Sequence, residues 1–360
     1  MIDFAQRLTR FRSELAASEA EAILVSGQAN IRYLSGFTGE YGALLIDQNN
    51  AVLASDFRFR YQAAEQAPGF RFREIRRWVE GVAQAARDLG HRVVGFEPSQ
   101  ITFQVHSQLS AEMSEVRLLP VNGVVERLRA VKDPEELARI ERAAAITDAA
   151  VERLMSQVRP GITERELALA AEDCIRKEGG AELAFPPIVA SGPRSAQCHA
   201  EPGPRRLTAG DLVVIDVGAR YEGYGADITR TIAVGSASQA QREIYALCYR
   251  AQATGLDAVR AGMRCRDLDR AARSVIEDAG RGEDFGHGLG HGVGLEAHEA
   301  PRLTSTEEAT LVGDMTVTIE PGIYTKEAGG VRLEDLVVVA EDGHRLLTHA
   351  AKPAELPVLG

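Results

Sequence analysis

The amino-acid sequence predicts an α/β protein made of two domains. Strand-like and helix-like segments alternate over residues 1–125, which is typical of a layered α/β domain. A strong helix start follows at Asp133, and beyond residue 211 two similar strand–turn–strand segments lie about a hundred residues apart. The chain has 360 residues, 45% of them hydrophobic, which is enough for two cores.

The first domain is expected to span residues 1–125. Its N-terminal segment, MIDFAQRLTRFRSELAA, indicates an amphipathic helix, because it lacks the apolar stretch of a signal peptide. Apolar runs predict strands at 22–26, 41–46, 50–55, 91–96 and 116–121. Helical segments are expected at 57–67, 78–90 and 99–114, so that strands and helices alternate.

The second domain is expected to span residues 126–360. Asp133 is a good N-cap, Pro134 suits the first helical position, and acidic residues follow in the first turn, so a helix should run to about Met155. Further helices are expected at 163–178, 238–260 and 265–280. Strands are expected at 212–218, 226–234, 315–324 and 331–339.

Charge and composition exclude several classes of protein. The net charge of -11 argues against nucleic acid or an anionic membrane as a partner, because both attract basic surfaces. No segment approaches the roughly 18 consecutive apolar residues of a membrane span. The four cysteines show no C-x-x-C spacing, which indicates reduced thiols, some of them buried, in a cytoplasmic protein.

The repeated segments carry acidic residues at matching places. Asp216 in VVIDVG aligns with Glu320 in VTIEPG, and the second strands carry Asp227 and Glu334. A carboxylate within an apolar strand is costly to bury unless it is paired or binds a metal ion. The repeat therefore predicts one shared site with a pair of carboxylates from each half.

Four adjacent carboxylates repel one another unless cations neutralise them. Oxygen-rich ligand sets suit Mn²⁺, while Co²⁺ and Zn²⁺ also accept mixed nitrogen and oxygen ligands. Two such ions, about 3.5–4 Å apart, can lower the pKa of a bridging water and polarise a carbonyl group. The predicted chemistry is therefore hydrolysis.

The segment FGHGLGHGVGLEAHE, residues 285–299, contains three histidines and alternating glycines. Because glycine costs about 1 kcal/mol per helical position, this backbone is expected to be extended or irregular. We expect at least one of His287, His291 and His298 to bind metal and at least one to act in catalysis. Dinucleotide-binding, phosphate-loop, HExxH and GxSxG motifs are absent from the sequence.

Four segments of the sequence resemble the metallopeptidase family of Xaa-Pro aminopeptidases, prolidases and methionine aminopeptidases. They are IDVGARYEGYGADITRT, HGLGHGVGLEAHE, TIEPGIY and VRLEDL. The resemblance covers about residues 127–350. It implies the "pita-bread" fold, in which two pseudo-symmetric halves surround a dinuclear metal centre. An N-terminal α/β domain disfavours a methionine aminopeptidase, and the complete ligand set disfavours a creatinase.

The resemblance implies a role for each site residue. The metal ligands would be Asp216, Asp227, His291, Glu320 and Glu334, with Asp227 and Glu334 bridging two ions. Glu320 would take a proton from the bridging water, His298 would stabilise the tetrahedral intermediate, and His199 and His287 would contact the substrate. Arg332 would orient the bridging carboxylates, and Tyr324 would line the site.

The implied activity is removal of an N-terminal residue that precedes proline, with closest likeness to the shorter bacterial Xaa-Pro aminopeptidases. The alternatives are an Xaa-Pro dipeptidase (prolidase) and an inactive peptide-binding homologue. Small peptides with proline in second position would be the substrates, and the protein would be a cytoplasmic homodimer. Two positions depart from the family pattern: Phe59 replaces tyrosine, and Cys198 precedes His199 where proline is common.

Overall fold

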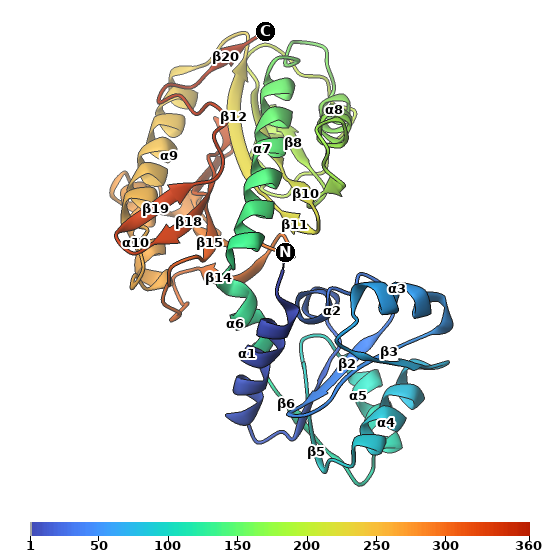
Figure 1. Ribbon diagram of the computed structural model, residues 1–360. Coiled ribbons are helices and arrows are strands. Elements are labelled where there is room, and N and C mark those ends of the chain that lie inside the picture. The colour runs from blue at the N-terminus through green and yellow to red at the C-terminus, as the bar shows by residue number, and fades with distance from the viewer. Residues whose placement is uncertain (1) are drawn as a thin grey trace. The chain divides into compact units, whose positions relative to one another are not determined.

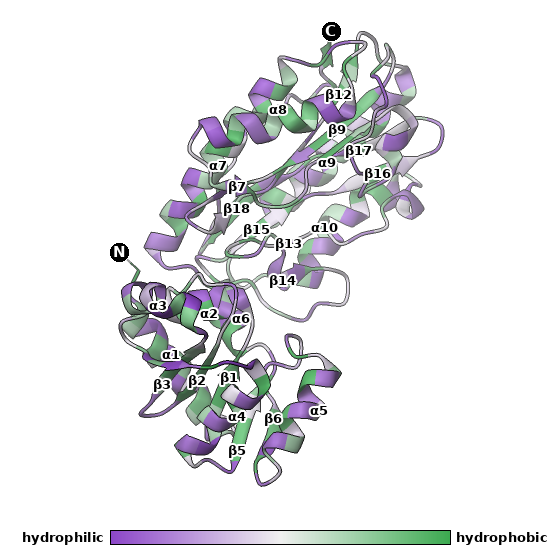
Figure 2. Cartoon of the chain, turned by 90° about the vertical axis from the view of Figure 1, so that its right-hand side faces the viewer, coloured by the Kyte–Doolittle hydropathy of each residue, from purple (hydrophilic) through white to green (hydrophobic). Residues whose placement is uncertain are grey.

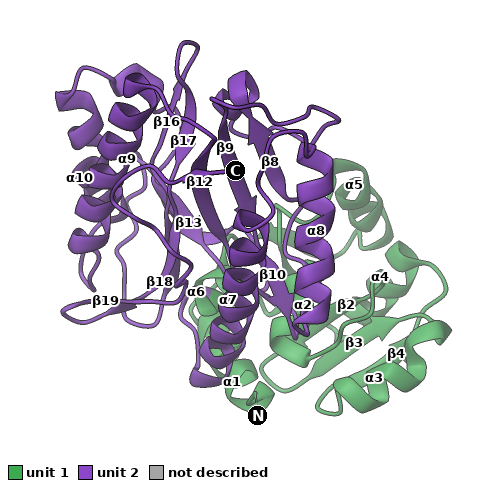
Figure 3. Cartoon of the chain, turned by 90° about the horizontal axis from the view of Figure 1, so that it is seen from above, with its two compact units in different colours: residues 1–129 green, residues 130–360 purple. Residues whose placement is uncertain are grey.

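The structure, a computed structural model, describes residues 2–360 and divides into two units (Figure 3). Unit 1 comprises Met1–Arg129 and unit 2 comprises Ala130–Gly360. Each unit has its own sheets and its own buried hydrophobic clusters. Within residues 2–360, no helix combines the length and apolar character needed to cross a membrane.

Unit 1 is a single six-stranded sheet with helices packed on it (Figure 1). The strand order is β4 (Arg71–Glu74), β3 (Ala51–Ser55), β2 (Ala43–Asp47), β1 (Ala22–Val25), β5 (Val93–Phe96) and β6 (Arg117–Pro120). The helices are α1 (Phe4–Ala16), α2 (Gln28–Ser35), α3 (Arg60–Gln66), α4 (Trp78–Leu89), α5 (Phe103–Glu112) and α6 (Val124–Ala130). The β1–β2 and β2–β3 pairings are antiparallel, and the other pairings are parallel.

The expected strands and helices of this region are present, and three further elements were missed. The extra elements are α2, β4 and α6. Helix α2 begins after Gly27, which offers no capping side chain, and the backbone N–H of Gly27 instead donates to Glu97, 2.8 Å away. Because the capping carboxylate comes from a distant part of the chain, the sequence around residue 27 does not indicate the start of a helix. Phe59, in place of tyrosine, packs edge-on against Phe37.

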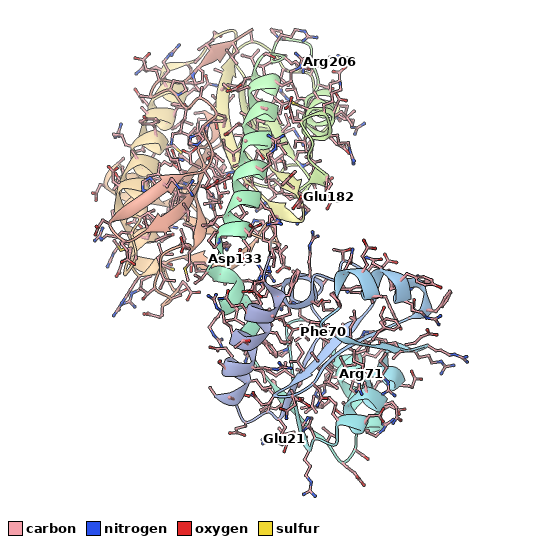
Figure 4. All side chains as sticks on the ribbon, in the orientation of Figure 1. Glu21, Phe70, Arg71, Asp133, Glu182 and Arg206 are labelled. Atoms are coloured by element: carbon pink, nitrogen blue, oxygen red, sulfur yellow. The ribbon has the colours of Figure 1, made fainter. Side chains whose placement is uncertain are left out.

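The first half of unit 2 consists of two helices on a four-stranded sheet. Helices α7 (Pro134–Met155) and α8 (Glu164–Lys177) lie together, and each shows hydrophobic and hydrophilic residues along its length (Figure 2). The sheet order is β20 (Val358–Leu359), β12 (Ile228–Val234), β9 (Leu212–Val217) and β8 (Ile188–Ser191). Asp133, labelled in Figure 4, forms the capping box that starts α7, as the sequence predicted.

The second half of unit 2 repeats this plan. Helices α9 (Gln239–Ala258) and α10 (Cys265–Asp278) pack on a five-stranded sheet. Its order is β14 (Glu299–Leu303), β13 (Gly290–Gly292), β15 (Thr316–Ile319), β18 (Asp335–Ala340) and β19 (Gly343–Leu346). The extended backbone expected in the glycine-rich segment is confirmed at β13.

The two acid-bearing segments adopt matching structures. In the first, β9 pairs antiparallel with β12, and the short strands β10 (Ala219–Tyr221) and β11 (Tyr224–Gly225) form a hairpin between them. In the second, β15 pairs with β18 around the hairpin of β16 (Gly322–Thr325) and β17 (Gly329–Arg332). The predicted repeat is therefore confirmed, although the sequence suggested longer, uninterrupted strands. A small strand, β7 (Glu182–Leu183), joins β10 and was not foreseen.

The face of β9 that carries Asp216 follows from strand alternation. Val213, Ile215 and Val217 enter the core formed with α7 and α8. Asp216 therefore projects from the opposite face of the sheet, away from those helices. All four cysteines are free thiols, and Cys248 and Cys265 are buried, as expected.

The last residue of β2, Asp47, is an acid with a lowered pKa. Asp47 lies 2.8 Å from His91 Nε2 and accepts hydrogen bonds from the backbone N–H groups of Asn49 and Asn50. Burial raises the pKa of Asp47, but these hydrogen bonds outweigh burial and lower the pKa to about 2. Such a group stabilises the fold fully above its unfolded pKa of about 4, and loses that effect as the pH falls toward 2.

We expect Asp47→Asn to lower the unfolding free energy of unit 1 at pH 7 by about 1–3 kcal/mol. The difference from wild type should shrink as the pH falls from about 4 to about 2. Trp78 is the only tryptophan and lies in α4, so its fluorescence in urea reports on unit 1. The exposed Glu65→Gln change is the control, and a difference between wild type and the Asp47→Asn variant that stays constant with pH would contradict the argument.

Candidate active site

The five predicted metal ligands lie where strands of unit 2 end or break. Asp216 lies in β9 and His291 in β13, Glu320 directly follows β15, and Asp227 and Glu334 directly precede β12 and β18. Ligand atoms of Asp227, His291 and Glu334 all lie within 4.8 Å of one another. Glu320 Oε1 is 3.2 Å from His291 Nε2, and the Asp216 carboxyl interacts with that of Asp227. The structure thus brings all five side chains together.

The carboxylates are short of hydrogen-bond partners. Asp216 Oδ1, Asp227 Oδ1 and Glu334 Oε1 are buried and have no hydrogen-bond partner among the described residues. Burial first, and then neighbouring carboxylates, raise the pKa of Asp227 and Glu334 well above the usual range; burial also raises the pKa of Asp216. Unpartnered buried oxygens are expensive, and divalent cations would satisfy them. The donor set of oxygens with one imidazole therefore fits metal ions.

The tautomer of His291 is fixed by its own strand. Its Nδ1 lies 3.0 Å from the carbonyl oxygen of Gly292, which can only accept, so Nδ1 carries the proton. Nε2 therefore presents a lone pair toward Asp227, 3.7 Å away, and Glu320. This arrangement is the usual one for a metal-ligating imidazole.

The glycines around His291 permit close packing of three strands. A Cβ on Gly290 would lie 2.0 Å from the carbonyl oxygen of Thr318, and a Cβ on Gly292 would lie 2.2 Å from that of Ala300. Any side chain at either position would push β13 away from its neighbours. The glycine alternation noted in the sequence therefore serves to place His291 between the two flanking strands.

A second layer of side chains orients the ligands from both halves. Arg332 Nη2 donates to Asp216 Oδ2 at 2.5 Å, and Arg332 Nε donates to Thr229 Oγ1 at 3.1 Å. Thr229 Oγ1 in turn donates to Glu334 Oε2 at 2.6 Å. Thr229 was not singled out in the sequence, although strand alternation from Asp227 places it on the same face.

Tyr324 connects Arg332 to His287. Its hydroxyl oxygen accepts from Arg332 Nη1 at 2.9 Å and lies 3.0 Å from His287 Nε2. Because His287 Nδ1 donates to the carbonyl oxygen of Gly288, Nε2 of the neutral ring accepts the tyrosine proton. Burial lowers the pKa of His287, which keeps it neutral. Both ring nitrogens of His287 thus form hydrogen bonds within the protein. The sequence had instead suggested that His287 contacts the substrate.

His298 lies on the bend between β13 and β14. Its ring centroid is 4.0 Å from that of His291, and partial burial next to His291 lowers its pKa to about 4. The next residue, Glu299, forms a buried ion pair with Lys132, with 2.8 Å between Lys132 Nζ and Glu299 Oε1. This ion pair holds the end of the bend. The lowered pKa of His298 keeps its ring neutral beside the carboxylate cluster.

A cavity of about 520 Å³ in unit 2 opens over this cluster. Such a volume lies within the range of small-molecule sites. The five ligand residues and Arg332 line it together with His199, His287 and His298. Tyr324 is not among the described residues that line the cavity and lies behind its wall. The lining also includes an apolar side formed by Phe185–Ile188, and the residues Cys198 and Arg302, which were not predicted from the sequence.

The geometry defines a metal-dependent hydrolase site with neutral imidazoles around a carboxylate cluster. Residues 138–341 match Metallopeptidase family M24, and residues 7–131 match the Creatinase/Prolidase N-terminal domain. The chain therefore belongs to metallopeptidase family M24, whose pita-bread fold is the one predicted.

Related proteins agree over nearly the whole chain. An Xaa-Pro dipeptidase of Pyrococcus furiosus is 35% identical over 95% of this chain and 97% of its own length. The structure of an Xaa-Pro dipeptidase from Bacillus anthracis is 38% identical, with a TM-score of 0.95 and coverage of 99% of this chain and 100% of that chain. The X-Pro aminopeptidase structure from Thermotoga maritima is 34% identical, with a TM-score of 0.90 and coverage of 98% and 99%.

We expect Asp227→Asn to have opposite effects on the metal-free and the metal-loaded protein. Without metal, the amide should raise the thermal midpoint at neutral pH, because it removes a buried carboxyl whose raised pKa makes folding less favourable. With saturating Mn²⁺, the stabilisation by metal should shrink, because stabilisation by a ligand follows its affinity. Thermal unfolding with and without metal, together with measured metal stoichiometry, tests both effects.

The control for this experiment is Asp173→Asn, on the exposed face of α8, which should change neither midpoint measurably. If Asp227→Asn lowered the stability of the metal-free protein and left the response to Mn²⁺ intact, the proposed ligand role of Asp227 would be wrong.

Proposed function

We propose that this chain is an Xaa-Pro dipeptidase, which hydrolyses dipeptides whose second residue is proline. The proposal departs from the aminopeptidase favoured by the sequence, because two of the three relatives described above carry the dipeptidase name. The observation that carries it is the placement of Arg302 on the wall of the same cavity as the carboxylate cluster. A dipeptide ends in a carboxylate one residue beyond the scissile bond, and a guanidinium recognises that group well.

The proposed holders of two divalent ions are Asp216, Asp227, His291, Glu320 and Glu334. When bound, the ions would supply Lewis acidity toward the scissile carbonyl and a water of lowered pKa at neutral pH. Manganese is the proposed metal, because four of the five ligands offer oxygen. The homodimer and the cytoplasmic location stay predictions from the sequence.

Glu320 is the proposed proton carrier. Its Oε1 accepts a hydrogen bond from Thr318 Oγ1 at 3.3 Å and faces His291 Nε2. Oε2 is thereby left to take a proton from the attacking water and to deliver it to the proline nitrogen as the peptide bond breaks. Thr318 keeps the carboxylate oriented during this transfer.

His298 is the proposed donor to the carbonyl oxygen. Its pKa of about 4 leaves it neutral at pH 7, with one N–H available for the negative charge that develops on that oxygen. His199 lies on the same cavity wall and would contact the substrate. The apolar side chains of Phe185 and Ile188 would exclude water and suit an apolar side chain or the proline ring.

The function is tested with two substrates in the presence of Mn²⁺, Co²⁺ or Zn²⁺. We expect Ala-Pro to be cleaved with a higher kcat/KM than Ala-Pro-Ala. Arg302→Ala should raise KM for Ala-Pro by about 10- to 100-fold, because one charge-assisted hydrogen bond is lost, and should leave Ala-Pro-Ala within about threefold.

Arg266→Ala is the matched control, since Arg266 lies on α10 and pairs with Glu308 on the surface. Cleavage of the tripeptide alone would instead identify an aminopeptidase. Bound metal without turnover of either peptide would support an inactive homologue.

We expect His298→Ala to lower kcat for the preferred peptide by about 10²–10³-fold, as for the loss of one oxyanion donor, with a smaller change in KM. Metal-induced thermal stabilisation should stay near that of wild type, because His298 is not a proposed ligand. Steady-state kinetics and thermal unfolding together measure both effects. An unchanged kcat would assign the oxyanion contact to another group.

A further inference from the structure

A buried carboxylate at the start of α8 takes no part in the capping box of that helix. Thr163 caps α8, and Glu166 completes the capping box by accepting from the backbone N–H of Thr163. Glu164, between them, is 0% exposed. Burying a carboxylate is unfavourable unless its oxygens are fully hydrogen-bonded, so Glu164 requires another explanation.

The partners of Glu164 lie in the segment that carries His199. Oε1 accepts from the backbone N–H of Ser191 at 2.9 Å and from its hydroxyl at 2.7 Å. Oε2 accepts from the backbone N–H of Gly203 at 3.0 Å and from Arg194 Nε at 3.1 Å. One carboxylate therefore holds residues on both sides of residues 192–202, which we call the His199 loop.

The His199 loop forms one wall of the cavity. Its residues 198–202 all line the cavity, and only its first part is regular, as the 3-10 helix η2 (Gly192–Ala196). Two contacts fix its inner side to β17: Gly330 N–H donates to Ser195 Oγ at 2.8 Å, and Arg332 Nη1 donates to the carbonyl oxygen of Cys198 at 3.2 Å. Arg194 also donates to the carbonyl oxygen of Glu201.

These contacts divide the support of the loop between two elements. Strand β17 holds the inner side, next to Arg332, while the Glu164 carboxylate joins the two ends. The ends are also held by the pairing of Ser191 with Val213 and by the backbone hydrogen bond from Arg165 N–H to the carbonyl oxygen of Gly203. Without the carboxylate the two ends would no longer be joined to each other, and the residues after η2 have no strand or helix of their own to keep their position. His199, which follows Cys198 directly, would then lose its place on the cavity wall.

We propose that Glu164 is a positioning residue, which holds the His199 loop closed and so sets the place of His199 in the substrate site. The part that concerns substrate rests on the proposed function. Glu164 touches neither the ligand cluster nor the substrate space, because it does not line the cavity. Its effect on the reaction acts through the loop alone.

The test compares Glu164→Gln with Glu166→Gln, which alters an exposed acid in the same helical turn. Glutamine at 164 keeps the shape but turns an N–H₂ group toward donors, so the two donors that face this group lose their acceptor on residue 164. We expect hydrogen–deuterium exchange of residues 192–203 to rise at least about tenfold in the metal-free protein. Glu166→Gln should leave that segment unchanged.

The kinetic arm uses a double-mutant cycle with His199→Ala. Alone, Glu164→Gln should raise KM for Ala-Pro about tenfold with a smaller change in kcat, because a substrate contact is displaced. In the His199→Ala background the same change should alter KM by less than about twofold. A purely structural role would lower activity equally in both backgrounds.

Three outcomes are separable. Faster loop exchange with the non-additive KM supports the proposal. Unchanged exchange, or equal losses in both backgrounds, overturns it. If wild type cleaves no Xaa-Pro peptide, the proposed function fails, while the exchange comparison still decides whether Glu164 holds the loop. If Glu164→Gln does not fold, Arg194→Gln takes its place, because it removes one partner and leaves the carboxylate. The proposal then requires that Arg194→Gln also speed the exchange of residues 192–203.

Discussion

Repulsion among buried carboxylates is the constraint on which the catalytic unit depends. Two acids from each half meet in the interior, and burial and their mutual charge raise the pKa of most of them. Among the described residues, Arg332 is the buried cation bonded to the cluster, and a single guanidinium balances only one of the four charges. Lys132 and Arg230, buried in the same unit, are paired with Glu299 and Asp335. The remaining negative charge must therefore be neutralised by cations from solution, and divalent ions neutralise it with the smallest number of bound ions.

The strands tolerate this cluster because their neighbours are tightly held. Asp335, next to Glu334, accepts from Arg230 Nη2 at 2.8 Å, and Arg230 Nη1 donates to the backbone oxygen of Glu334 at 2.5 Å. In β9, the residues that flank Asp216 are fully buried in apolar clusters. Ion pairs and packing around the cluster thus hold the like-charged carboxylates close together and orient them.

The sequence predicted the ligand cluster because its signals are local. Asp216 and Glu320 stand out within apolar strand patterns, and their repetition about a hundred residues apart indicated two halves. Contacts between distant residues gave no such signal. Gly27 receives its helix cap from Glu97, and the partners of Glu164 lie 27 to 39 residues further along the chain. Arg302 follows His298 closely, but only the folded cavity shows that it faces the same space.

The site separates into two kinds of support, and this separation bears on substrate choice. The ligands come from strands of both halves, with neighbours locked by buried ion pairs and hydrogen bonds. His199 and His298 come instead from loops, each fixed by a buried charged group, Glu164 in one case and the Lys132–Glu299 pair in the other. Relatives with the same fold carry both dipeptidase and aminopeptidase names. The shared strands cannot account for that difference. Preference for peptide length would therefore depend on the residues of the cavity wall, which include Arg302.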